Sequence, residues 1–165
     1  MSRAFVKDDS EQDDDLPQRP VSSRPNYVTR RGLGLLKERV RELTARRSAL
    51  IARADDPGSR QERRLVERDL LYYDARLASV IIVDNSERPP EDVRLGAVVE
   101  TADAEGKTRR FEIVGEDEAD AQAGKLNWAS PLADALLGKK PGDRAVWKRE
   151  EGPLELKVVS VSYPK

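Results

Sequence analysis

Residues 53–62 read RADDPGSRQE, and this short stretch decides how the first half of the chain folds. Its central Asp-Asp-Pro-Gly-Ser run combines residues that favour turns with a proline that cannot extend a preceding helix. Ser59 is predicted to cap the helix that follows, because Glu62 stands three residues later at the spacing of a capping box. The sequence therefore predicts a sharp turn between two helices.

Apolar residues recur at heptad spacing on both sides of this turn. One helix is predicted over residues 30–53, with Thr29 as its N-cap, and a second over residues 59–82. The first stripe consists of Leu33, Leu36, Val40, Leu43 and Leu50, with Arg47 in the skipped position, and the second of Val66, Leu70, Tyr73, Leu77 and Val80. Two such stripes predict an antiparallel coiled-coil hairpin over residues 28–84, roughly 35 Å long.

The pattern changes beyond residues 85–92, which are predicted to be a linker because they contain two adjacent prolines. Short alternating runs then predict strands, and Ser130 followed by Pro131 predicts the start of a short helix. The predicted elements are strands at 97–101, 110–114, 144–149 and 154–162 and a helix at 130–138. The fold class is therefore α+β, with the hairpin followed by a small antiparallel β domain over residues 93–165.

The composition excludes several classes of function. The 165 residues include no cysteine and no histidine, which excludes disulfides, thiol catalysis, imidazole-dependent triads and the usual zinc sites. The net charge of −1 predicts no global attraction to nucleic acid or membrane. There is no run of about 18 apolar residues, and Met1–Asp15 lacks the apolar core of a signal peptide. A cytoplasmic protein without membrane association is expected.

The first 27 residues differ from the rest of the chain in composition. They carry three prolines and six acidic residues against four basic ones, with few large apolar side chains. Such a segment offers little apolar burial to offset the entropy that is lost on ordering. A disordered acidic tail is predicted over residues 1–27, and binding of a metal or a basic partner is the alternative role of its acidic run.

Four stretches, in the right order, resemble the GreA/GreB family of transcript cleavage factors. They are Tyr27–Gly32, Arg110–Gly115, Ser130–Asp143 and Leu156–Tyr163. The third, SPLADALLGKKPGD, is the most specific, because it fixes a helix start, a helix end and a turn at one spacing. The resemblance implies a coiled-coil hairpin followed by an FKBP-like C-terminal domain.

The resemblance also implies a partner and a mechanism. The globular domain would dock on bacterial RNA polymerase beside its secondary channel, and the hairpin would enter the channel with its tip toward the catalytic magnesium. In the cleavage factors, the acids of a Gly-Asp-x-Ser-Glu-Asn-Ala motif at the tip help to hold a second metal, which activates water for hydrolysis of backtracked RNA. Such a factor assists the polymerase and is not itself an enzyme.

This chain departs from the family pattern at the tip. The motif is absent, and Asp55, Asp56 and Glu62 do not match its acids one by one. The hairpin is also shorter by about one heptad per arm, which leaves the tip roughly 10 Å short and resembles the abbreviated coiled coil of Rnk-like relatives. We therefore expect a regulator that occupies the channel without classical cleavage stimulation. It would have no catalytic residue and no metal of its own, and any magnesium would be shared with the polymerase active site.

Three groups of residues are candidates for contact with the polymerase. The tip candidates are Asp55, Asp56 and Glu62. The basic first helix offers candidates for contact with the channel or, indirectly, with nascent RNA: Arg39, Arg46, Arg47 and Arg53. The docking candidates are Asp134, Lys139 and Lys140. The plainer alternatives are a solvated turn for the tip acids and a solvated helix face for the arginines.

Two other functions stay open at this stage. One is GreA/GreB-type cleavage stimulation through the tip acids, and the other is a coiled-coil adaptor that makes no contact with the polymerase. The adaptor would dimerise through leftover apolar surface such as Ile51, Leu71 and Ile81, whereas the preferred hypothesis predicts a monomer.

Overall fold

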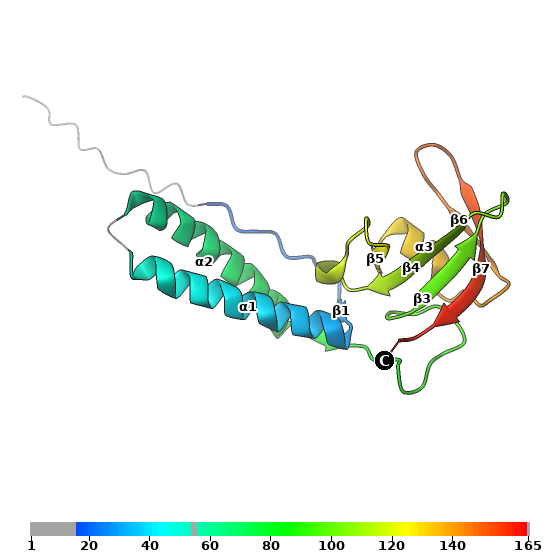
Figure 1. Cartoon of the computed structure of the whole chain (residues 1–165), viewed down its shortest axis with the longest axis horizontal. Coiled ribbons are helices and arrows are strands. Elements are labelled where there is room, and N and C mark those ends of the chain that lie inside the picture. The colour runs from blue at the N-terminus through cyan, green and yellow to red at the C-terminus, as the bar shows by residue number, and fades with distance from the viewer. Residues whose placement is uncertain (1–15, 54–55, 165) are drawn as a thin grey trace, which may run out of the picture.

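The chain folds into a helical hairpin and a curled β-sheet domain that lie end to end (Figure 1). The computed structural model describes residues 16–53 and 56–164. The predicted α+β class, with the hairpin first and the sheet domain second, is confirmed. The segment 83–97, which has neither helix nor strand, connects the two parts.

The hairpin consists of α1 (Arg30–Ile51) and α2 (Pro57–Ala78), each of 22 residues. At 1.5 Å per residue each arm is about 33 Å long. The predicted apolar seam lies between the arms: its buried members are Leu43 and Leu50 from α1 and Val66 and Leu70 from α2, with Val40 and Tyr73 packed against them. Thr29 caps α1 as predicted, because its hydroxyl accepts a hydrogen bond of 3.0 Å from the N–H of Gly32.

The limits of the second helix differ from the prediction. It begins at Pro57, and its N-cap is Asp56 rather than Ser59, since the Asp56 carboxylate accepts a hydrogen bond of 3.0 Å from the N–H of Ser59. Pro57 occupies the first helical position, where its missing N–H is not needed. The helix ends at Ala78, so Val80, which was predicted to belong to the helical stripe, lies in a strand instead.

That strand, β2 (Val80–Ile82), pairs in parallel with β1 (Asn26–Val28) at the base of the hairpin. The sequence predicted neither strand, because three residues are too few to show an alternating pattern. The predicted tail boundary at residue 27 therefore falls inside β1, whose Asn26 and Val28 are buried.

Residues 16–25, also predicted to belong to the tail, run beside α2 toward the base of the hairpin (Figure 1). The Arg19 guanidinium lies 3.9 Å from the ring centroid of Tyr72 and 3.4 Å from the Asp69 carboxylate. Arg24 donates a hydrogen bond of 3.1 Å to the carbonyl of Ala129 in the sheet domain. These contacts hold this part of the predicted tail in place, whereas residues 1–15 lie outside the described residues.

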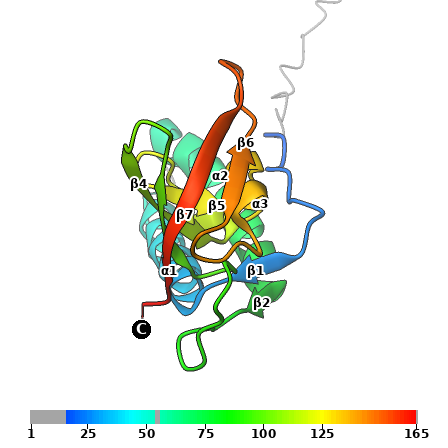
Figure 2. The same ribbon diagram turned by 90° about the vertical axis from the view of Figure 1, so that its right-hand side faces the viewer.

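The sheet domain contains five strands in the order β5-β4-β3-β7-β6. Figure 2 shows this domain facing the viewer, with β7 and β6 next to each other. The strands are β3 (Val98–Ala102), β4 (Thr108–Val114), β5 (Lys125–Asn127), β6 (Arg144–Trp147) and β7 (Leu154–Ser162). The predicted hairpins β3–β4 and β6–β7 are both antiparallel. The prediction of an antiparallel domain is wrong only for β5, a strand that the sequence did not reveal and that pairs in parallel with β4.

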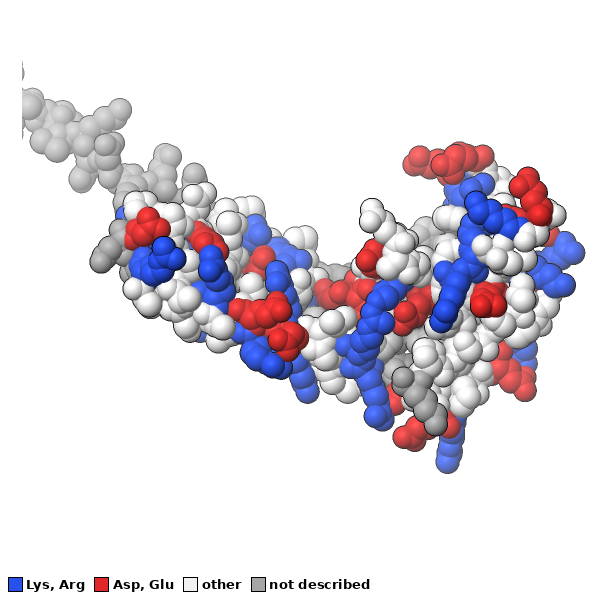
Figure 3. All heavy atoms as spheres, in the orientation of Figure 1, with Lys and Arg blue, Asp and Glu red and all other residues white. Residues whose placement is uncertain are grey.

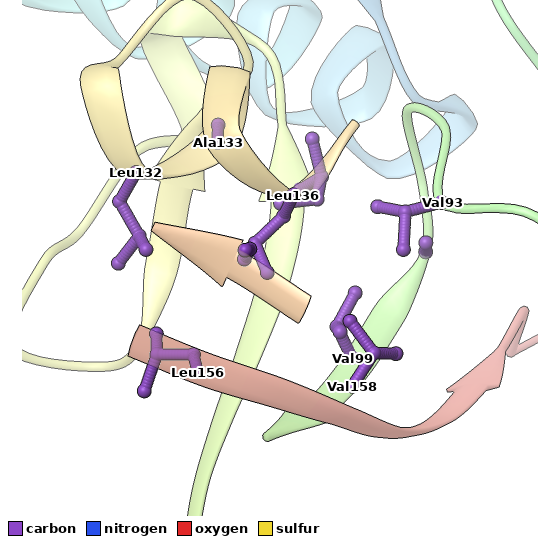
Figure 4. Close-up of a cluster of buried hydrophobic side chains, with 10 residues drawn as sticks. Val93, Val99, Leu132, Ala133, Leu136, Leu156 and Val158 are labelled. Atoms are coloured by element: carbon purple, nitrogen blue, oxygen red, sulfur yellow. The ribbon is translucent and has the colours of Figure 1, made fainter. Parts of the chain in front are cut away.

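The core of this domain lies between the sheet and α3 (Pro131–Leu136), as Figure 4 shows. Its labelled members are Val93, Val99, Leu132, Ala133, Leu136, Leu156 and Val158, all of them buried. Ser130 caps α3 as predicted, because its hydroxyl accepts a hydrogen bond from the N–H of Ala133. Within the described ranges, neither long helix carries an apolar stretch that would cross a membrane.

Candidate functional site

The tip of the hairpin carries one described acid whose carboxylate forms the helix cap. Oδ2 of Asp56 accepts hydrogen bonds from the Ser59 hydroxyl at 2.9 Å and from the Ser59 N–H at 3.0 Å. These bonds lower the pKa of the Asp56 carboxyl below its ordinary value, so the group is ionised at neutral pH. Asp55, the neighbouring tip candidate, lies outside the described residues.

Glu62, the third tip candidate, is bound by the opposite arm of the hairpin. Its Oε1 accepts hydrogen bonds from Nε and from the terminal nitrogen Nη2 of Arg46, at 2.7 and 2.5 Å. The structure thus brings together one tip candidate and one channel candidate, and it joins α1 to α2 through them. The capping-box role of Glu62 is wrong, because Ser59 is not the N-cap.

The other channel candidates of α1 lie in different surroundings. Arg39 forms an ion pair of 3.2 Å with Glu42, and its guanidinium lies 5.8 Å from the ring centroid of Tyr73. Arg47 is half-buried in the skipped seam position, and Arg53 is exposed near the tip. Figure 3 shows basic side chains interspersed with acidic ones along the hairpin, so much of the basic charge of α1 is locally compensated.

The docking candidates lie on the short helix α3 of the sheet domain or just after it. Asp134 is exposed on α3 and helps to line a hollow of about 490 Å³, whose wall also includes Arg24 and Trp128. Lys140 is exposed and forms an ion pair of 3.1 Å with Glu91. Lys139 is half-buried, and its carbonyl accepts a hydrogen bond from the N–H of Val93. Asp134 is therefore the docking candidate that faces a concave surface.

The apolar residues proposed for an adaptor role are exposed but belong to different elements. Leu71 lies on α2, Ile51 ends α1, and Ile81 lies in β2, with exposed fractions of 62%, 50% and 46%. Among the described residues, no group of three or more acidic side chains is arranged to hold a metal ion.

Sequence reasoning missed a buried polar cluster at the base of the hairpin. A single 3₁₀ turn, Glu116–Glu118, follows β4, and we call it the acidic turn. Nε of Arg76, from the last turn of α2, lies 2.6 Å from Oδ2 of Asp117, and its Nη2 lies 3.0 Å from Oε2 of Glu116. Arg76 is only 1% exposed, yet its neighbour Leu77, which was predicted to lie in the seam, is only half-buried.

Burial by itself lowers the pKa of Arg76, but the hydrogen bond and the charge of Asp117 outweigh it, and the pKa is raised. Tyr72 donates a hydrogen bond of 2.8 Å to the other oxygen of Asp117. Burial and this bond raise the pKa of Tyr72 to about 12. The cluster therefore holds a charged guanidinium and a neutral phenol at neutral pH.

The third acid of the turn, Glu118, contacts α1 instead of α2. Its carboxylate accepts hydrogen bonds of 2.6 Å from the Thr29 hydroxyl, 3.3 Å from the Thr29 N–H and 3.2 Å from the Gly115 N–H. Gly32 permits this approach, because a methyl group at its Cα would overlap the Glu118 carboxyl group. The acidic turn thus contacts both arms of the hairpin.

Known proteins are similar to this chain in sequence. The family profile described as transcription elongation factor, GreA/GreB, C-term, matches residues 88–163. The transcription elongation factor GreB of Neisseria meningitidis serogroup A / serotype 4A is 31% identical over 155 residues, which cover 85% of this chain and 95% of that protein. The chain belongs to the GreA/GreB family of transcription elongation factors.

Two further proteins are similar in sequence to this GreA/GreB family member. GreA of Methylococcus capsulatus is 36% identical over 112 residues, which cover 67% of this chain and 71% of that protein. A crystal structure of GreA factor homolog 1 of Thermus thermophilus is 26% identical, covers 84% of this chain and 99% of its own, and has a TM-score of 0.41.

Proposed function

We propose that this chain binds bacterial RNA polymerase and regulates elongation by placing its hairpin in the secondary channel, without classical stimulation of transcript cleavage. Family membership supports the partner, since the relatives are named as transcription elongation factors. The protein is not an enzyme in this proposal, and any magnesium involved belongs to the polymerase. Its effect on elongation comes from occupying the channel.

The observation that carries the proposal is the engagement of the described tip acids within the hairpin itself. Oδ2 of Asp56 holds the N-terminus of α2, and Oε1 of Glu62 holds Arg46. A carboxylate oxygen that coordinates a metal lies about 2.0–2.6 Å from it. Among the described tip acids, only the other carboxylate oxygen, Oδ1 of Asp56 and Oε2 of Glu62, could therefore serve a second metal without competing with these contacts.

The length of the arms supports the same conclusion. The helices of 22 residues are slightly shorter than predicted, so the expected shortfall of roughly 10 Å against the cleavage factors is not reduced. This shortfall exceeds any metal–oxygen distance several-fold, and only deeper docking would compensate for it.

The test is an RNA cleavage assay on a stalled, backtracked elongation complex, combined with competition against a cleavage-stimulating GreA or GreB protein. We expect the chain to suppress cleavage by the competitor and to add none of its own. Cleavage above the intrinsic rate of the polymerase that disappears in the Asp55→Asn/Asp56→Asn variant would replace this proposal with the cleavage-factor alternative. Asparagine is used at residue 56 because its amide oxygen retains the helix cap.

Docking is tested by Asp134→Arg, which reverses a charge at the edge of the hollow beside α3. We expect this variant to lose competition, whereas Lys107→Glu in the β3–β4 turn, also a charge reversal at an exposed residue, retains it. If neither variant loses competition, docking through α3 is contradicted. If the chain shows no polymerase binding and its mass by light scattering rises with concentration, the adaptor alternative is supported.

A further inference from the structure

The buried cluster at the base of the hairpin has no part in the proposed docking surface or in the tip. We propose that Arg76 is a positioning residue, which, with the acidic turn, locks the hairpin at one angle to the sheet domain and thereby fixes where the tip lies relative to the docking surface. The consequence for transcription rests on the proposed function, whereas the locking itself does not.

The contacts of Arg76 come from two separate segments, the acidic turn and β1. Its guanidinium meets Asp117 and Glu116 of the acidic turn and also donates a hydrogen bond of 2.7 Å to Oδ1 of Asn26 in β1. Asn26 returns a hydrogen bond of 2.7 Å from its amide to the carbonyl of Arg76. Because the guanidinium is a rigid planar fork, these acceptors fix its orientation and not only its distance.

A rotation of the hairpin about its base would break this arrangement. Arg76 is 1% exposed, so a guanidinium that lost both Asp117 and Glu116 would remain buried without a compensating charge. An unpaired buried charge is strongly unfavourable, because no water replaces the lost partner. The native angle between hairpin and sheet domain is therefore strongly favoured over other angles. Exposed ion pairs would not give such a preference, because water would replace a lost partner.

The other arm, α1, is bound to the same turn through Glu118. Its carboxylate contacts Thr29 at the N-terminus of α1, while Asp117 contacts Arg76 and Tyr72 at the C-terminal end of α2. Figure 1 shows this turn at the junction, between the hairpin base and the sheet. Two arms bound to three successive residues of one turn resist both tilting and twisting of the hairpin.

The cluster is not the main source of folding stability for either the hairpin or the sheet domain. The hairpin has its own apolar core and the sheet domain has another, and the two cores share no residue. What the junction adds is a fixed orientation of the hairpin relative to the sheet domain. This orientation matters because the hairpin is long, so a small rotation at its base moves the tip far. With an arm of about 33 Å, a rotation of roughly 15° at the base moves the tip by about 9 Å.

The absence of cysteine allows the angle to be measured with a single pair of introduced labels. Ala45→Cys in α1 and Lys157→Cys in β7 are both exposed, one in each part of the chain. Spin labels at these positions report the distance distribution between the two parts by pulsed electron paramagnetic resonance. The native background and the Arg76→Met variant are compared with Arg63→Met, which removes another α2 arginine, one whose ion pair with Glu67 stays within the hairpin.

We expect one narrow distribution for the native background and for Arg63→Met, and a clearly broadened or displaced one for Arg76→Met, with unchanged helix content by circular dichroism. An unchanged distribution in Arg76→Met would overturn the proposal. If Arg76→Met fails to fold, the double variant Glu116→Gln/Asp117→Asn is the second variant, because it keeps the shape of both partners and removes their charges. A native distribution in that variant would overturn the proposal equally.

The functional readout separates positioning from docking. Arg76→Met should bind the polymerase with nearly native affinity, because α3 is untouched, while its effect on elongation falls by about tenfold or more, since the tip is misplaced. Equal losses of affinity and effect would mean that Arg76 acts through docking, which would contradict the positioning role. If the native protein does not bind the polymerase, the proposed function fails while the distance measurement still decides whether Arg76 locks the hairpin.

Discussion

Arg46 and Glu62 bind each other across the hairpin, with 2.7 Å between Nε and Oε1. The sequence marked these two residues for separate roles, one as a contact for channel or RNA and the other as a tip acid. Their side chains are 52% and 43% exposed, so water screens the pair and its contribution to stability is at most about 1 kcal/mol. The pair therefore adds little to the stability of the hairpin. Its main effect is that the charges of Arg46 and Glu62 are less available to a binding partner.

Glu62→Gln should release Arg46 at little cost in stability. We expect the free energy of unfolding, measured in urea, to change by less than about 1 kcal/mol, and the affinity for a short single-stranded RNA to rise at low salt because one arginine is freed. Glu42→Gln, which releases Arg39 in the same helix, is the matched control. Loss of RNA affinity in Glu62→Gln would contradict this account of the pair.

Asp56 combines a structural and a charged role that two substitutions separate. Asp56→Ala removes the acceptor of both Ser59 hydrogen bonds and should lower the urea midpoint, whereas Asp56→Asn should retain most of the cap. The folded-state pKa of Asp56 is lowered by those bonds, so its stabilisation is present above the ordinary value of 3.8 and is lost as pH falls through the lower folded value. The difference between native and Asp56→Ala midpoints should therefore vanish only in strong acid, and a difference that vanished near neutral pH would exclude this carboxylate cap.

Two glycines in the first turns of α1 should respond to alanine in opposite directions. At Gly32 the new methyl group would overlap the Glu118 carboxyl group, which is held by Thr29 and Gly115. We expect Gly32→Ala to destabilise the protein by about 1–3 kcal/mol, in the range of overpacked sites. At Gly34 nothing lies within 4 Å of the added group, so Gly34→Ala should stabilise the helix by about 0.5–1 kcal/mol. Thermal unfolding measures both, and stabilisation by Gly32→Ala would show that Glu118 is not fixed.

The parts of the fold that were predicted from the sequence are those with a local signal. The seam of Leu43, Leu50, Val66 and Leu70 follows from heptad spacing within each helix, and the start of α3 follows from Ser130 and its neighbour. The wrong cap of α2 arose because Asp56 and Ser59 are both good N-cap residues. Pro57 was the deciding signal, since proline favours the first helical position and therefore places the cap directly before it.

The base of the hairpin was not predicted, because its partners are distant in sequence. Arg76 finds Asp117 41 residues further along the chain, and nothing near Arg76 marks it as buried. β1 and β2 are three residues long, which is too short for a periodic pattern. The candidate residues at the tip and on α1 were identified by type and position, but the bond between Arg46 and Glu62 depends on how the two arms are aligned and required the folded hairpin.

Tyr72 provides a spectroscopic test of the same base cluster. Its pKa is raised from 10.0 to about 12 by burial and by the hydrogen bond to Asp117, so the protonated form is favoured in the folded state. The stabilisation is therefore fully present below pH 10, the unfolded value, and is lost as pH rises through about 12. Burial also raises the pKa of Tyr163, so two of the four tyrosines should ionise late in a tyrosinate absorbance titration. Tyr72→Phe should remove the step near pH 12.

Asp117→Asn separates the two causes of the raised pKa. It removes the neighbouring negative charge and leaves the burial of Tyr72 in place, so the late ionisation should move part of the way back toward 10.0. The free energy of unfolding of the native protein should exceed that of Tyr72→Phe by a constant amount below pH 10 and by a shrinking amount above it. Persistence of the step near pH 12 in Tyr72→Phe would assign that step to another tyrosine and remove the support that titration gives to the Tyr72–Asp117 bond.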